Sequence, residues 1–91
     1  MKPKNASLEA ALLTLETEVE MRRFLTDLCT PNELRAFEER WAIAQELHSG
    51  QGSYRDIAAM LKASTATVTR VARFLLQERH QGYRLVLDRL S

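Results

Sequence analysis

The sequence has little of several features that mark whole classes of protein, and each shortage excludes one class. Its single cysteine, Cys29, cannot form an internal disulfide, which suits a reducing compartment. No apolar run approaches the roughly 18 residues of a membrane span. The N-terminal stretch MKPKNASLEAALL opens a region whose apolar residues are interrupted by Glu9 and Glu16, so we do not expect a signal peptide. The expected location is therefore cytoplasmic, with no membrane partner.

Residue patterns for catalysis and for metal binding are also scarce. The soft metal ligands are Cys29, His48 and His80, and their spacing fits no zinc pattern. The three glycines form no phosphate-binding loop, and no Ser/His/Asp or Cys/His arrangement has a supporting motif. We therefore expect a protein that is not an enzyme and that has no metal site and no cofactor.

Charge is nearly balanced over the whole chain but not between its two halves. The formal net charge is +1 at pH 7. Residues 1–49 contain six Lys/Arg and nine Asp/Glu, a net charge of −3, whereas residues 50–91 contain seven and three, a net charge of +4. The basic second half indicates either an anionic partner or a solvated basic face, and charge alone favours neither.

A strong helix-start signal stands before the middle of the chain. Thr30 is a suitable N-cap, Pro31 occupies the first helical position, and Glu33 is placed to bond back to the cap. The helix is expected to end at Ser49-Gly50, where glycine can take the left-handed conformation, and Gln51-Gly52 completes a short loop.

Weaker signals precede this helix. Ser7 or Asn5 can cap a first helix, and Thr17 with Glu20 forms a possible capping box for a second. Nothing between Leu15 and Val19 forces a break, so one continuous helix is the alternative.

The segment STATVTRV, residues 64–71, is rich in β-branched side chains, which favour strands. Alternation leaves neither side of a strand cleanly apolar, whereas a helix of 3.6 residues per turn gathers one apolar stripe and one polar side. The stripe comprises Val68, Val71, Ala72 and Leu75, continued at its edge by Leu76. Helical periodicity therefore predicts a helix. With a break at Gln81-Gly82 and a C-terminal helix over residues 82–91, the chain is predicted to be all-α, with about six helices.

Residues 53–76 have the form of a helix-turn-helix. Ser53 starts a capping box for a short first helix, and Ser64 or Thr65 can cap the second. Ala58 supplies the small residue needed where the two helices cross. Lys62 stands where the connector usually has glycine, so it either accepts strain on the order of 1 kcal/mol or the turn differs.

The second helix of this motif has side chains that suit the major groove of DNA, which is about 12 Å wide. Small methyl and hydroxyl groups can reach base edges, and arginines can reach phosphates or a guanine. A helical hairpin with a basic solvated surface is the alternative interpretation. The candidate DNA-binding residues are Arg55, Thr65, Ala66, Thr69, Arg70 and Arg73.

The stretch LCTPNELRAFEERWAIAQELHSGQGSYRDIAAMLKASTATVTRVARFL resembles the tryptophan repressor family over about residues 28–76. The matching parts are the TP-x-E cap, an arginine ten residues after the threonine, the E-L-x-x-G helix end and the A-T-V-T-R segment. The resemblance implies an all-helical, intertwined homodimer that binds a palindromic operator in double-stranded DNA. Residues 1–49 would form the dimerisation helices, and two-fold symmetry would place the two heads roughly 34 Å apart. Its DNA-facing positions fall on Arg55, Thr65, Ala66 and Thr69.

The family's corepressor is L-tryptophan, and the resemblance carries its binding residues onto this chain. Two guanidinium groups and hydroxyl donors fit the carboxylate of an amino acid. Ordinary ion pairing of the two arginines with Glu38 or Glu39 is the alternative. The candidate effector-binding residues are Thr30, Arg40, Thr67 and Arg70.

Two departures from the family pattern concern the same pocket. Val71 and Phe74 stand at the positions of a pocket glycine and a nearby pocket serine. The valine would occupy space that an indole ring needs, and the phenylalanine would fill the slot. We therefore expect that tryptophan does not bind. The head would then be fixed by its self-filled pocket or tuned by a different small ligand, such as an unidentified carboxylate.

Taken together, these patterns predict a single all-α domain over residues 1–91 that acts as a homodimeric, sequence-specific DNA-binding regulator, and specifically as a repressor. The alternative is a helical protein-interaction module that retains the helix-turn-helix shape without reading DNA, which the near-zero net charge favours.

Overall fold

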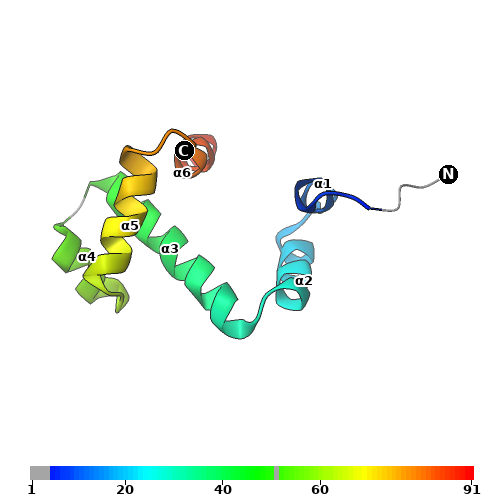
Figure 1. Ribbon diagram of the computed structural model, residues 1–91, viewed down its shortest axis with the longest axis horizontal. Coiled ribbons are helices and arrows are strands. Elements are labelled where there is room, and N and C mark those ends of the chain that lie inside the picture. Colours follow the sequence, from blue (N-terminus) through cyan, green and yellow to red (C-terminus); the bar gives the residue numbers. More distant parts are fainter. Residues whose placement is uncertain (1–4, 51) are drawn as a thin grey trace. The chain divides into compact units, whose positions relative to one another are not determined.

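A computed structural model describes residues 5–50 and 52–91, and these residues form six α-helices and no strand (Figure 1). The predicted all-α class with about six helices is confirmed. Residues 1–4 of the N-terminal stretch and Gln51 of the predicted loop lie outside the described residues. The helices are α1 (Leu8–Leu12), α2 (Glu18–Leu28), α3 (Pro31–Ser49), α4 (Tyr54–Leu61), α5 (Thr65–Leu76) and α6 (Gly82–Leu90).

The chain divides into two compact units, Met1–Leu34 and Arg35–Ser91. In the first unit, α1 and α2 are separate helices rather than one. The Ser7 hydroxyl oxygen accepts the N–H of Ala10 at 3.0 Å, and the Thr17 hydroxyl oxygen accepts the N–H of Glu20 at 3.1 Å. Each helix thus has its own N-cap. Neither α1 nor α2 contains a buried residue.

Thr30 begins α3 through the predicted capping box. Its hydroxyl oxygen accepts the N–H of Glu33 at 3.1 Å, and the Glu33 carboxylate accepts the N–H of Thr30 at 2.8 Å. The box thus gives hydrogen-bond acceptors to the N–H groups of Thr30 and Glu33, which the helix itself leaves without partners. At the other end Gly50 follows with a φ of 75°, as predicted for the residue after the helix.

A hydrophobic core joins the second part of α3 to α4 and α5 in the second unit. Within it, α4 packs against α5, and α5 against α6. The predicted stripe of α5 is buried, from Val68 at 0% exposed to Ala72 at 4%, whereas Leu76 at its edge is 57% exposed. The helical interpretation of the β-branched segment is therefore correct. The core cluster comprises Ile43, Ala44, Ile57, Ala58, Val68 and Val71.

The connector between α4 and α5 has the geometry of a helix-turn-helix turn. Lys62 has φ 57° and ψ 40°, so it takes the left-handed conformation usual for glycine and accepts the strain. The N–H of Ala63 donates to the Ala58 carbonyl at 2.9 Å, which closes the end of α4. Ser64 then caps α5 by accepting the N–H of Thr67 at 3.0 Å.

The turn between α5 and α6 also contains a residue in the left-handed conformation. The break falls at Gln81-Gly82 as predicted, but the positive φ, 56°, belongs to Gln81. The helix that follows, α6, buries Leu87. In the part of the chain that the structure describes, no helix combines the length and apolar character needed to cross a membrane.

Candidate functional site

The N-terminal half of α5 presents small side chains to solvent. Thr65, Ala66 and Thr69 are all exposed, as the groove-facing interpretation requires. The Thr69 hydroxyl donates to the Thr65 carbonyl at 2.9 Å, so its oxygen still has lone pairs free to accept. This surface offers methyl groups and hydrogen-bond acceptors, with no bulky side chain among the three residues that would block entry into a groove.

Three arginines lie in the same unit as this surface. Arg55 on α4 and Arg70 and Arg73 on α5 are exposed. The guanidinium carbons of Arg70 and Arg73 lie 4.7 and 5.1 Å from the centroid of the Phe74 ring. One aromatic ring therefore holds both cations near the helix surface. All six residues predicted to bind DNA thus belong to α4 and α5 and are accessible.

A pocket of about 230 Å³ lies in the second unit, among α3, α5 and the start of α6. It brings together two of the four candidate effector residues, Arg40 and Arg70, and both residues expected to fill the pocket, Val71 and Phe74. Its volume is below the roughly 300 Å³ at which small-molecule sites usually begin. The lining residues are Arg40, Arg70, Val71, Phe74, His80, Gly82 and Tyr83.

The other two candidate effector residues do not line this pocket. Thr67 has its hydroxyl 2.9 Å from that of Ser64, within the cap of α5. Thr30 belongs to the first unit, where its hydroxyl oxygen caps α3. Both threonines therefore have local structural contacts, and their effector-binding role stays a prediction.

The pocket is lined by cations without carboxylates. The guanidinium carbon of Arg40 lies 5.2 Å from the centroid of the Phe37 ring, and that of Arg70 lies 4.7 Å from the centroid of the Phe74 ring. Ion pairing of these arginines with Glu38 or Glu39 stays an alternative interpretation. Because no acidic side chain lines the cavity, it suits an anion.

Sequence reasoning missed three pocket residues, His80, Gly82 and Tyr83. The His80 ring stacks on Phe74, with ring centroids 6.3 Å apart and planes inclined by 18°. In the sequence His80 is considered only as a metal ligand, and its spacing fits no zinc pattern. The signal for its location was the break at Gln81-Gly82, which turns the chain back beside α5.

The chain matches the family described as "Trp repressor protein" over residues 5–91, well beyond the stretch of about residues 28–76 on which the sequence resemblance rested. It is 38% identical over 81 residues to the uncharacterised protein YerC of Bacillus subtilis (strain 168), and the alignment covers 89% of this chain and 76% of YerC.

Two solved structures have a similar fold. One is a TrpR-like protein from Eubacterium eligens, which is 38% identical with a TM-score of 0.83 and matches 91% of this chain and 84% of its own. The other is a candidate Trp repressor from Staphylococcus aureus with the same identity and TM-score, matching 91% of this chain and 81% of its own. At 38% identity, the similarity of this chain to both structures indicates common descent as well as a common fold.

Proposed function

Because the chain belongs to the Trp repressor protein family, we propose that it is a sequence-specific DNA-binding regulator that represses transcription from operators in double-stranded DNA. The proposal rests mainly on the small, exposed side chains at the start of α5. The opposite side of the same helix packs in the core, which holds these side chains at the surface. The family is one of regulators rather than enzymes.

In this proposal the α4–α5 unit is the DNA-reading head. Thr65, Ala66 and Thr69 enter the major groove, where methyl groups meet thymine and hydroxyl oxygens accept from base edges. Arg55 and Arg70 bind phosphates on either side of the groove and position the head. The positive charge of residues 50–91 supports this assignment, because phosphate contacts dominate affinity for DNA.

The proposed active species is a homodimer. The first unit supports it, because its helices bury no residue while Leu13 and Val19 are 86% and 71% exposed. Apolar side chains that are this exposed favour association with another surface. A two-fold dimer would bring the same surface of each copy together. Two heads related by that symmetry would bind a palindromic operator with half-sites one turn of DNA, roughly 34 Å, apart.

The proposed effector is not tryptophan. Val71 is only 1% exposed and forms a wall of the pocket, and Phe74 forms another, which leaves about 230 Å³. An indole ring would compete with these two side chains for the same space. The arginines of the lining fit a smaller anion, so we propose a small carboxylate if an effector is used at all.

Selection of DNA from a random pool with the purified protein tests the proposal directly. Enrichment of a palindrome supports a dimeric reader of DNA. No binding at about 50 mM salt, where phosphate contacts are strongest, would favour the protein-interaction module instead. The expected cytoplasmic location stays a prediction.

A single substitution tests the assignment of faces. Thr69→Glu places a negative charge on the groove side, so it should abolish operator binding with little change in folding, as followed by circular dichroism. Ser91→Glu is the control, because Ser91 is exposed outside the proposed dimerisation helices and its hydroxyl makes the same kind of bond, to the Leu87 carbonyl at 3.1 Å. Unfolding of the Thr69 variant would mean that this side of α5 is not exposed.

A further inference from the structure

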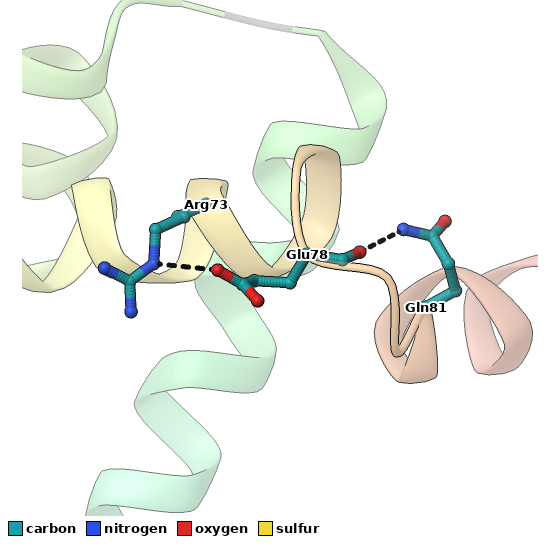
Figure 2. A network of polar contacts seen from close by, with 3 residues as sticks. All are labelled: Arg73, Glu78 and Gln81. Carbon is teal, nitrogen blue, oxygen red and sulfur yellow. Dashed lines mark hydrogen bonds and ion pairs between the residues drawn. The ribbon is translucent and has the colours of Figure 1, made fainter.

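One of the cations on the DNA-reading head is already neutralised within the protein. The Nε atom of Arg73 lies 3.6 Å from Oε2 of Glu78 (Figure 2). The two side chains are 53% and 38% exposed, so the pair is accessible to a ligand and not sealed in the core. Arg73 is one helical turn beyond Thr69, on the exposed side of α5.

Glu78 is held in place by its own backbone. Its N–H donates to the Arg73 carbonyl at 2.9 Å. Its carbonyl accepts from Nε2 of Gln81 at 2.7 Å, as Figure 2 shows. These bonds fix the backbone of Glu78, so its side chain starts within reach of Arg73 and loses less freedom on pairing than a side chain on a mobile segment would. The Phe74 ring, 5.1 Å from the guanidinium carbon, restrains the other partner.

We propose, on the basis of the proposed function, that Glu78 competes with DNA phosphates for Arg73 and so limits the DNA affinity of each head. A phosphate and the carboxylate are alternative anionic partners for one guanidinium. While Glu78 holds it, the pair carries no net charge and releases no counterion from DNA. The same carboxylate repels a phosphate that approaches from the exposed side.

The effect has a measurable size. Each phosphate neutralised by a protein cation adds about 0.9 to the magnitude of the slope of log affinity against log salt. Removal of the Glu78 charge therefore should steepen this slope by about 0.9 for each head bound, or about 1.8 for a dimer. Loss of Arg73 in the wild-type background should leave the slope nearly unchanged, because its charge is already offset.

The experiment measures binding of a fluorescein-labelled duplex of mixed sequence by anisotropy between about 50 and 200 mM KCl. The variants are Glu78→Gln, Glu78→Ala, Arg73→Met and the double variant Arg73→Met/Glu78→Gln. We expect tighter binding and a steeper slope for both Glu78 variants, and a clearly smaller gain from Glu78→Gln once Arg73 is absent. Asp88→Asn, which removes an exposed negative charge elsewhere in the same unit, is the control and should bind like the wild type.

Three results would overturn the inference. One is a wild-type slope for both Glu78 variants, with helix content intact. Another is an equal gain for Glu78→Gln with and without Arg73, or for Asp88→Asn, which would mean a general effect of net charge. If the wild type and the variants all fail to bind DNA, the proposed function fails and the inference with it. Binding by the wild type with unchanged Glu78 variants instead refutes the inference alone.

Discussion

Shortening Val71 should destabilise the protein, because this side chain belongs to the core as well as to the pocket. It is 1% exposed and packs in the cluster that joins α3, α4 and α5. Val71→Ala removes two buried carbon groups worth about 0.8 kcal/mol each and leaves a small cavity, so the loss should be about 2 kcal/mol. Val71→Gly, which restores the residue type of the family pocket, should lose about 1 kcal/mol more through helix propensity.

These losses are large for a domain whose total stability is about 5 to 15 kcal/mol. Urea unfolding followed by circular dichroism measures them. With an m-value of about 2 kcal/mol per molar, Val71→Ala should lower the midpoint by about 1 M. Protein concentration must be kept constant, because the stability of the proposed dimer would depend on it.

The matched control is Val86→Ala on α6, where the same side chain is 45% exposed. It should change the free energy of unfolding by less than about 0.5 kcal/mol. A change below about 0.5 kcal/mol for Val71→Ala as well would refute the reasoning, since it would mean that Val71 does not support the core. In that case one substitution at Val71 could open the pocket to an indole ring without loss of stability. Our account instead requires further changes in the core to offset the loss.

Three further predictions follow from the pocket, the turn and the first unit. Calorimetric titration with L-tryptophan should give no heat of binding, and micromolar affinity would contradict the self-filled pocket. Lys62→Gly should be close to neutral, because relief of about 1 kcal/mol of left-handed strain is offset by the entropy of glycine in the unfolded chain, whereas Lys62→Val should cost more than about 1 kcal/mol in a urea titration. Sedimentation equilibrium of the full chain at micromolar concentration should give the mass of a dimer, and a monomer would remove the support that the exposed Leu13 and Val19 give to the proposed assembly.

Helix boundaries were predictable from the sequence because caps are local. The boxes at Thr30 and Ser53 need partners only three residues away, and both form in the structure. Thr17 illustrates the limit of such signals. Its cap separates α1 from α2, although the residues around it left a continuous helix possible.

The conformation of Lys62 was not decided by the sequence around it. A lysine is free to avoid positive φ in a short peptide, and the local pattern allowed two kinds of turn. The packing of α4 against α5 fixes the connector between them, and the turn takes the left-handed conformation in spite of the strain. Tertiary contacts outweigh a local preference of about 1 kcal/mol.

The pocket was predictable only in part. Arg40 and Arg70 came from the resemblance, and their stacking partners were within reach of helix spacing, since Phe37 and Phe74 lie three and four residues away. His80 depends instead on the direction in which the chain leaves α5, and the break at Gln81-Gly82 marks where the chain turns without giving that direction.

The use of every side of α5 has a consequence for how such a regulator can evolve. The core stripe tolerates few replacements, and the side that contains Arg70 and Phe74 forms a wall of the pocket. Changes in operator preference are then left to the few positions at the start of the helix. Phe74 is a special case, because its ring contacts Arg70 at the pocket and Arg73 beside it. Under the proposed function, a substitution of Phe74 that reshaped the pocket would also remove the ring beside Arg73, so ligand response and DNA affinity would change together.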